Sequence, residues 1–335
     1  MHSLCEPSLH RRRSHAIRVL SPAVLVLLAV FALLAGCSDD RTSPAPLAPE
    51  AQPVAANAQN SAVVNGRIAF SALAGGGVAI FSMNPDGTDR RQLTTNPVGD
   101  DWDAAVSPDG RKIAFVRSEG TAANVYVMNA DGSGVHQLTA FVPGGYAEGP
   151  AWSPDGKRIA LTGSETGVHS GIYVVSANGH NLAPVAAQGA EDMQPAWAPD
   201  GQRIAFTRVG GMGTNIMIAD VVAGGSAQLF ALCGSIACHA PAWSPDGTRI
   251  AYERDGTLQV QPLVGAPQPA AFNLVGYAGG PVWAPDGTKL LFTGTVVDGG
   301  STRIALVTVA PDGAGPQPVS PGPAPEMYPS WGRQR

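Results

Sequence analysis

Residues 152–161 read Trp-Ser-Pro-Asp-Gly-Lys-Arg-Ile-Ala-Leu, and this stretch decides the fold because the chain repeats it. The turn at its centre has five copies, at 107–110, 153–156, 198–201, 244–247 and 284–287. An apolar triplet follows each copy, as in 113–115 or 250–252. Pro fixes φ early in such a turn, Asp accepts nearby backbone N–H groups, and Gly closes the turn. Each copy therefore predicts two strands joined by a tight turn.

The spacing of these copies is typical of a β-propeller. Successive turn aspartates lie 40 to 46 residues apart, which is the period of a propeller blade. We expect four strands in each repeat: one that ends at the Trp, the Ile-Ala-Phe strand, an alternating strand such as 125–128 or 172–175, and a short outer strand such as 137–139. Helical periodicity is absent from residue 63 onward, so the sequence predicts an all-β chain.

The two ends of the repeat region predict how the ring closes. Residues 66–70 match the second strand of a repeat without a first strand before them, whereas 328–331 match a first strand without a second strand after it. Pairing these halves completes one further blade, and closure removes exposed sheet edges. We therefore predict a six-bladed β-propeller over residues 63–335, with four-stranded antiparallel blades and the C-terminal strand paired to the N-terminal strands.

The N-terminus has the pattern of an export signal. Arginines at 11–13 and at 18 precede an apolar run, residues 23–36, that is shorter than the roughly 20 residues needed to span a bilayer. The run leads into Leu34-Ala35-Gly36-Cys37, which is similar to the lipobox of bacterial lipoproteins. We predict a signal peptide over residues 1–36 that is cleaved before Cys37, the acylated residue. An uncleaved anchor is the alternative.

A tether is predicted between the lipid and the propeller. Residues 37–62 are rich in Pro, Ala, Ser and Asn and contain few large apolar residues, a composition typical of disordered linkers. Ser rather than Asp follows Cys37, which favours the outer membrane. We expect an envelope lipoprotein that faces the periplasm or the cell surface and contacts the membrane through its lipid alone.

The overall composition excludes one class of partner. Charged residues make up only 14% of the chain, the net charge is −5, and just three of the 21 basic residues are Lys. The chain therefore lacks the basic field that holds nucleic acid, and DNA and RNA are excluded as partners. We expect a monomer that binds another envelope protein or a peptide.

The repeat resembles that of a known family. The unit Trp-Ser-Pro-Asp-Gly-x-x-Ile-Ala-Phe is similar to the WD-like β-propeller repeat of TolB and its relatives, and it extends over residues 66–331. The resemblance implies a six-bladed fold with a central channel that binds partners and cations. Similar repeats occur in oligogalacturonate lyases and in prolyl oligopeptidase-type enzymes, although the Gly-x-Ser-x-Gly motif of the latter's hydrolase domain is absent from this chain.

Side chains near the start of each inner strand are the candidates for ligand binding, because they ring the mouth of a propeller channel. They are Asp101, Trp102, Asp103, Glu148, Asp192, His239 and Glu326. Trp102 differs from the other five Trp, which share one register before the turn and are predicted to pack between blades. Acids from several blades could bind a hard cation such as Ca²⁺ or a basic peptide. Solvated loop acids are the alternative, and no other cofactor is expected.

Two cysteines remain after export. Cys233 and Cys238 are separated by four residues that include Gly and Ser. An oxidising compartment favours a disulfide between them. A metal site that includes His239, and free thiols, are the alternatives.

An enzymatic interpretation has few groups to use. His239 with Glu148, Asp192 or Glu326 could form a lyase or glycosidase site that acts on polysaccharide, because paired carboxylates suffice for glycosidic chemistry. The sequence does not require this pairing, and we assign no catalytic residue. The principal prediction is a lipid-anchored envelope propeller that binds a protein or peptide.

Overall fold

The computed structural model describes residues 63–165, 169–185, 191–210, 213–221, 227–231, 233–234, 237–264, 279–298, 301–320 and 325–334. The chain divides into two units, Met1–Ala45 and Pro46–Arg335, and every described residue belongs to the second unit. The predicted signal peptide and tether, with Cys37, lie outside the described residues. Within those residues, no helix has the length and apolar character needed to cross a bilayer.

The described residues form strands and turns, which confirms the all-β prediction. The strands are β1 Asn65–Ala74, β2 Gly77–Met83, β3 Arg91–Gln92, β4 Asp101–Val106, β5 Lys112–Glu119, β6 Ala122–Asn129, β7 His136–Gln137, β8 Tyr146–Trp152, β9 Arg158–Ser164, β10 Gly171–Ser176, β11 Ala183–Pro184, β12 Glu191–Trp197, β13 Arg203–Gly210, β14 Gly213–Asp220, β15 Gln228–Ala231, β16 Cys238–Trp243, β17 Arg249–Arg254, β18 Thr257–Pro262, β19 Gly279–Trp283, β20 Leu290–Asp298, β21 Ser301–Val309, β22 Gln317–Pro318 and β23 Glu326–Arg333.

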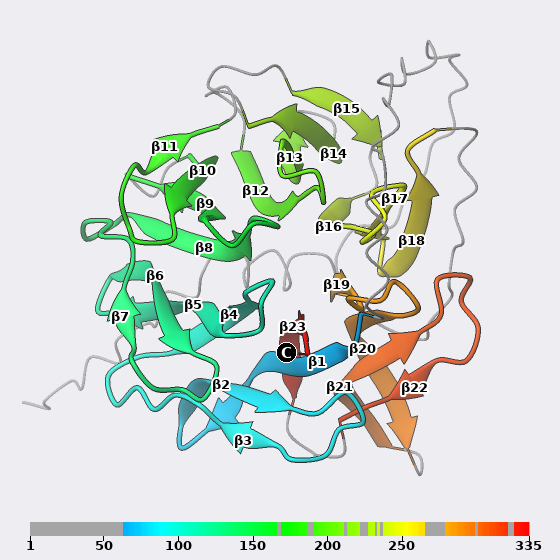
Figure 1. The fold of residues 1–335 in the computed structure, drawn as a ribbon, viewed down its shortest axis with the longest axis horizontal. Helices are drawn as coiled ribbons and strands as arrows, with labels where there is room; N and C mark the ends of the chain where they lie inside the picture. Colours follow the sequence, from blue (N-terminus) through cyan, green and yellow to red (C-terminus); the bar gives the residue numbers. More distant parts are fainter. Residues whose placement is uncertain are drawn as a thin grey trace, which may run out of the picture. The chain divides into compact units, whose positions relative to one another are not determined.

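These strands form five hydrogen-bonded sheets that surround a common axis (Figure 1). In strand order the sheets are β23-β1-β2-β3, β11-β10-β9-β8-β6-β5-β4 with β7 on β6, β12-β13-β14-β15, β16-β17-β18, and β19-β20-β21-β22. The eight-stranded sheet consists of two runs, β4 to β7 and β8 to β11, which a parallel pairing of Ala123 with Tyr146 joins. Sheets that radiate from an axis are the architecture of a β-propeller.

The C-terminal strand closes the ring, as the sequence predicts. β23 lies antiparallel to β1, with Trp331 opposite Ile68 and Glu326 opposite Ala72. The backbone N–H of Gln334 donates to the carbonyl of Val64 at 2.8 Å. Because β1 and β23 are the first and last described strands, their pairing ties the two ends of the propeller together.

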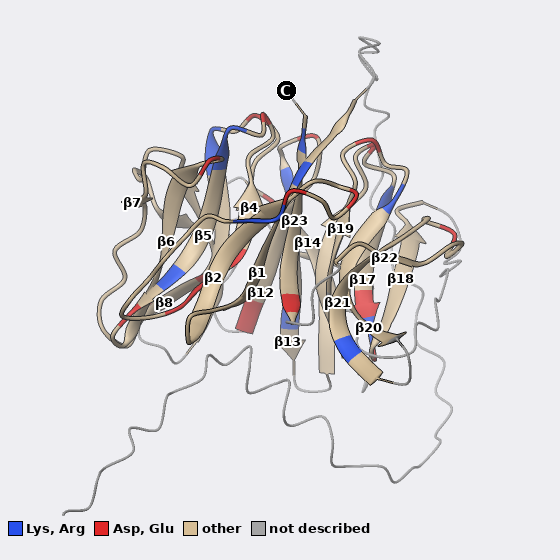
Figure 2. Ribbon diagram, turned by 90° about the horizontal axis from the view of Figure 1, so that it is seen from below, with Lys and Arg blue, Asp and Glu red and all other residues tan. Residues whose placement is uncertain are grey.

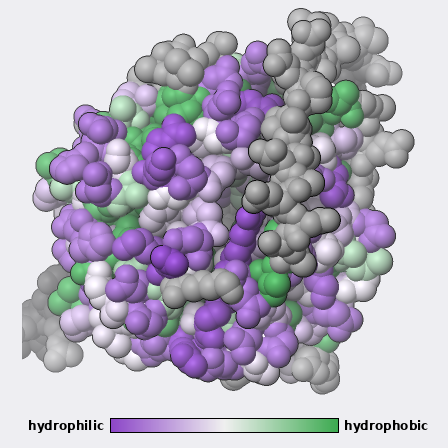
Figure 3. Space-filling view, in the orientation of Figure 1, coloured by the Kyte–Doolittle hydropathy of each residue, from purple (hydrophilic) through white to green (hydrophobic). Residues whose placement is uncertain are grey.

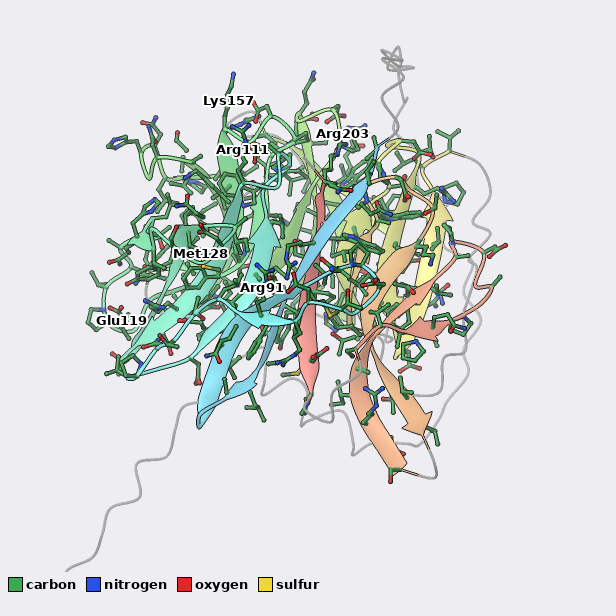
Figure 4. All side chains as sticks on the ribbon, turned by 60° about the horizontal axis from the view of Figure 1, so that its bottom comes forward. Arg91, Arg111, Glu119, Met128, Lys157 and Arg203 are labelled. Atoms are coloured by element: carbon green, nitrogen blue, oxygen red, sulfur yellow. A yellow bond between two sulfur atoms is a disulfide. The ribbon has the colours of Figure 1, made fainter. Side chains whose placement is uncertain are left out.

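The ring has two distinct faces, seen edge-on in Figure 2, because the inner strands begin on one side and end on the other. We name β23, β4, β8, β12, β16 and β19 the inner strands, and all but β23 lead into a Pro-Asp-Gly turn. These turns form the turn face, where Arg111, Lys157 and Arg203 lie in Figure 4 and where hydrophilic side chains predominate in Figure 3. The mouth face is the opposite side, where the inner strands begin.

Each Pro-Asp-Gly turn is fixed by its own side chains. In the first turn, the Gly110 N–H donates to the Ser107 carbonyl at 2.8 Å. Asp109 accepts from the Ser107 hydroxyl at 2.7 Å and from the Arg111 N–H at 3.0 Å. Gly110 has a φ of 67°, in the left-handed region that favours glycine. The turn aspartates are therefore structural, as predicted.

The repeated tryptophans pack between adjacent repeats, which confirms the prediction made from their register. Trp197 and Trp283 are 8% and 7% exposed. Their indole N–H groups donate to the carbonyls of Ala151 and Ala242, in the preceding inner strands, at 3.1 Å. The guanidinium of Arg158 lies 4.5 Å from the ring centroid of Trp197, a cation–π contact. Trp152, Trp197 and Trp283 thus each link two neighbouring inner strands.

The outer strands are shorter than predicted. β7 ends at Gln137 rather than at Thr139. Beyond it, the N–H groups of Leu138 and Thr139 both donate to the Val125 carbonyl, at 2.8 and 3.2 Å, and the Thr139 hydroxyl accepts from the Val125 N–H at 3.0 Å. A side-chain hydroxyl therefore replaces the next backbone pairing of the ladder.

Candidate functional site

Each inner strand contains a left-handed residue three positions before the residue of the Trp register. These residues are Asp103, Gly149, Gln194, Ala240, Gly280 and Tyr328, with φ from 51° to 58°. The pairing with the second strand shifts there, for example between Trp102 and Ala105 in β4 and between Met193 and Ala196 in β12. Such shifts mark β-bulges. The inner strands therefore all bend at the same height above the mouth face.

Hydrogen bonds that run around the ring hold these bulges. The Gln194 N–H donates to the hydroxyl of Thr162, in the preceding repeat, at 2.9 Å. The Ala240 N–H donates to the side-chain oxygen of Gln194 at 2.9 Å, and the Thr207 hydroxyl lies within 3.2 Å of the same N–H. A neutral side chain thus satisfies the bulge N–H of the next repeat.

Asp103 performs the same role with an ionisable group. The Gly149 N–H donates to its Oδ2 at 3.1 Å. In that repeat Val116 occupies the position of Thr162 and has no hydroxyl to offer. Burial raises the pKa of Asp103 to about 7, the neighbouring Glu148 carboxylate contributes to the rise, and the Gly149 N–H opposes it. Asp103 and Glu148 are therefore brought together as a pair of like charges.

The surroundings of this pair are also acidic. Burial, followed by the charge of Glu148, raises the pKa of Tyr146 at the start of β8. A hydrogen bond with Ser170 lowers that pKa, and the charge of Glu191 raises it. The charged groups that shift the pKa values of Asp103 and Tyr146 are all carboxylates. Carboxylates of β4, β8 and β12 therefore gather in this part of the mouth face.

Two other predicted acids form internal ion pairs. Asp101 is fully buried and accepts from Arg117 through both carboxylate oxygens, at 2.7 and 2.8 Å. Asp192, 1% exposed, does the same with Arg208 at 2.7 and 2.8 Å. These hydrogen bonds raise the pKa of each arginine. Such buried pairs are stable only when both partners are present, so Asp101 and Asp192 hold the strand ends in place.

Glu326 forms an ion pair with Arg90, the residue just before β3. Its register partner in β1 is Ala72, which offers no charge. Arg90 reaches it instead, with Nε 3.0 Å from Oε1, and the guanidinium lies 4.0 Å from the Phe81 ring centroid. Glu326 is 1% exposed, and its Oε2 has no hydrogen-bond partner among the described residues. This carboxylate is therefore bound within its own sheet, between β23 and the start of β3.

The remaining predicted residues, Trp102 and His239, are half-buried at equivalent positions of β4 and β16. His239 lies opposite Glu253 in the ladder. Burial lowers the pKa of His239 and raises that of Glu253 to about 7, which the Gly256 N–H opposes. In the described part of the chain, no contact joins His239 to Asp192 or Glu326, whose carboxylates are bound to arginines. Asp192 and Glu326 are therefore held by arginines of the chain.

The structure bears on two predictions, the disulfide and the metal site that includes His239. Cys233 and Cys238 form a disulfide, which leads directly into His239. Both cysteines are buried. Within the described ranges, no three His, Cys, Asp or Glu side chains form a group that could hold a metal ion.

A separate apolar pocket of about 210 Å³ lies on β20 to β22. Its lining includes Phe292, Val307 and Pro318, and none of the predicted site residues lines it.

Sequence reasoning missed the arginines of the mouth face. Arg117 follows Asp101 by 16 residues, and Arg208 follows Asp192 by the same interval. The interval reflects a strand, a turn and the return to the opposite position of the ladder. A search for acid and arginine at this constant spacing would have distinguished the paired acids from Asp103, which has no arginine at that spacing.

Comparison with known proteins finds a family match over part of the chain. Residues 140–254 match the family described as the TolB beta propeller domain. The crystal structure of TolB from Acinetobacter baumannii has the same fold, with a TM-score of 0.68 and 21% identity over 79% of this chain and 66% of that one. Over residues 140–254 the chain is therefore similar to the TolB β-propeller domain. It spans just under two thirds of the length of the A. baumannii TolB.

Other solved structures share the fold of this TolB-like chain. Hydrazine synthase of Kuenenia stuttgartiensis matches with a TM-score of 0.64 and 16% identity, over 81% of this chain and 47% of that one. A chain of the nidogen/laminin complex matches with a TM-score of 0.63 and 11% identity, over 79% and 98%. No curated protein sequence matches. Since one fold serves an enzyme and a binding protein, the function of the TolB-like chain must be argued from its site.

Proposed function

We propose that this TolB-like protein is a binding module of the cell envelope that captures a basic segment of a partner protein at its mouth face. It acts as a monomer without a bound cofactor, and it is anchored to the outer membrane by a lipid on Cys37. The proposal covers residues 63–335 as one domain of six blades. The sixth blade results from dividing the eight-stranded sheet at the Ala123–Tyr146 pairing.

The observation that carries the proposal is the Asp103–Glu148 pair. Asp101, Asp192 and Glu326 each bind an arginine of their own chain. Asp103 instead faces Glu148, and its raised pKa reflects both that charge and the removal of water. An ammonium or guanidinium group of a ligand would relieve this repulsion, since an opposite charge within a few ångströms favours the ionised carboxylate.

The neighbours of this pair suit a peptide rather than a bare ion. In four of the other five inner strands the position of Glu148 holds a half-buried Trp102, Met193, His239 or Met327, and in β19 it holds Gly279. Aromatic and Met side chains are typical of protein interfaces, where they contribute apolar contact around a polar centre. The mouth thus offers one acidic site with apolar flanks, which fits a basic side chain in an extended segment.

The start of β1 indicates the face on which the predicted tether joins the propeller. The side chain of Asn65 donates to Asp286, in the fifth Pro-Asp-Gly turn, at 2.8 Å, so β1 begins on the turn face. A tether that arrives from Cys37 joins the propeller on that face. As a random coil, a 26-residue tether has a root-mean-square reach of about 28 Å.

Calorimetric titration with a short peptide tests the proposal. The probe is an N-acetylated, C-amidated peptide with one Lys between apolar residues, compared with the same peptide carrying Gln in place of Lys. The Lys peptide should bind more tightly, and Glu148→Gln should weaken it about tenfold because one of the two charges is lost. Asp220→Asn, which removes an exposed carboxylate at the far end of β14, is the matched control. Equal binding of the two peptides, or equal effects of the two variants, would contradict the proposal.

A further inference from the structure

An acid near the start of an inner strand and an arginine opposite it on the second strand occur together, or are absent together, in most repeats. The two ladder pairs are Asp101–Arg117 and Asp192–Arg208, in which each arginine lies directly opposite its acid. In the β8–β9 ladder the same two positions hold Ala147 and Gly163, so both charges are missing. Where one member is present, the ring therefore normally supplies the other from the same chain.

Arg254 has the position of the arginine without the acid. It lies opposite Cys238 in the β16–β17 ladder, 16 residues further along the chain. Cys238 is fully buried and bonded to Cys233, so this position offers no negative charge. Tyr252 is placed two residues before Arg254, as an aromatic ring precedes the other two arginines. Burial raises the pKa of Tyr252 and the charge of Arg254 opposes the rise, which places the guanidinium near this ring.

No described acid forms an ion pair with Arg254. Glu253, on the opposite side of the strand, accepts from the Gly256 N–H at 3.0 Å, and Asp255 begins the hairpin turn with a φ of 50°. The undescribed segments after residue 165 contain neither Asp nor Glu. Arg254 is only half-buried, so solvent and ligands can reach it.

We infer that Arg254 is a carboxylate-binding position of the mouth face, for the C-terminal carboxylate or an acidic side chain of a peptide. The planar guanidinium accepts a carboxylate through two parallel hydrogen bonds, as Arg117 and Arg208 already do within the chain. The bound group would supply the charge that Cys238 cannot. This site lies on β17, apart from Asp103 and Glu148 on β4 and β8, so each site can bind when the other does not.

Side-chain nuclear magnetic resonance tests the inference on the full chain. The Nε–Hε resonance of Arg254, assigned by its loss in Arg254→Gln, should shift saturably when sodium acetate is added at constant ionic strength. The affinity for acetate should fall at least tenfold in Arg254→Gln. Arg333→Gln removes an exposed arginine at the end of β23, on the face opposite the mouth face, and should leave the titration unchanged. An equal shift with sodium chloride, or an unchanged acetate titration in Arg254→Gln, would overturn the inference.

Two further comparisons identify the source of the carboxylate and exclude a folding artefact. N-acetyl-trialanine with a free C-terminus, its C-terminal amide, and N-acetyl-aspartate amide present the terminal carboxylate, no carboxylate, and the side-chain carboxylate. Binding of either carboxylate but not of the amide supports the inference. Cys233→Ala with Cys238→Asp supplies an internal acid and should abolish acetate binding, whereas Cys233→Ala with Cys238→Ala should retain it. Equal binding by these two variants would overturn the inference.

Discussion

Replacing Asp103 by Asn should stabilise the fold at neutral and alkaline pH, at the expense of the proposed site. The pKa of Asp103 is about 7 in the folded chain, against an ordinary value of 3.8. Between these values the folded state holds a proton that the unfolded state has lost, so wild-type stability falls as pH rises. The full shift corresponds to about 4 kcal/mol, and since the side chain is half-buried rather than buried we expect about 2 kcal/mol.

The substitution keeps the local geometry. An Asn oxygen can accept from the Gly149 N–H, as Gln194 does for the equivalent group of the next repeat, and Asn tolerates a φ of 52°. Urea unfolding of wild type and Asp103→Asn at pH 5, 6, 7 and 8 measures the effect. The variant should gain stability relative to wild type as pH rises to 7 and then level off. A difference that does not change with pH, or a less stable variant at pH 8, would refute the reasoning.

Three other predictions concern the framework of the ring. Asp101→Ala leaves the guanidinium of Arg117 unpaired and should lower the unfolding free energy by about 3 kcal/mol; a loss below about 1 kcal/mol in urea would contradict the structural role. Replacing Cys233 and Cys238 by Ser should lower it by about 2 kcal/mol, because the disulfide closes a short loop, and alkylation of the unreduced wild type at either cysteine would argue against the bond. Deleting residues 327–335 removes most of β23 and should abolish cooperative thermal unfolding, so a variant that melts like wild type would refute closure.

Much of the fold could be predicted from sequence because its signals are local and repeated. The Pro-Asp-Gly turns and the apolar triplets after them specify strand pairs on their own, and each repeat confirms the assignment of the others. The pairing of β1 with β23 follows from two incomplete repeats. The short outer strands were harder to predict, because the Thr139 hydroxyl takes a place in the ladder that the sequence assigns to backbone.

The site was less predictable because charge neutralisation depends on which residues face each other across a ladder. Sequence reasoning grouped Asp101 with Asp103, although Asp101 lies opposite Arg117 and Asp103 occupies the bulge. The bulge itself has a weak sequence signal, since Gly occupies its left-handed position in only some inner strands and Asp, Gln, Ala or Tyr occupies it in the others. Neighbouring residues of one strand can therefore differ in role when a bulge separates their registers.

The pH dependence of peptide affinity tests the central claim, that Asp103 and Glu148 bind a basic side chain, most directly. Ionised Asp103 is the binding form, and with a pKa of about 7 its population rises about tenfold between pH 6 and pH 8. The dissociation constant of the Lys peptide for wild type should fall by that factor over this range. The constant for Asp103→Asn should be weaker and independent of pH. A wild-type affinity that is the same at pH 6 and pH 8, or one that Asp103→Asn leaves intact, would contradict the account.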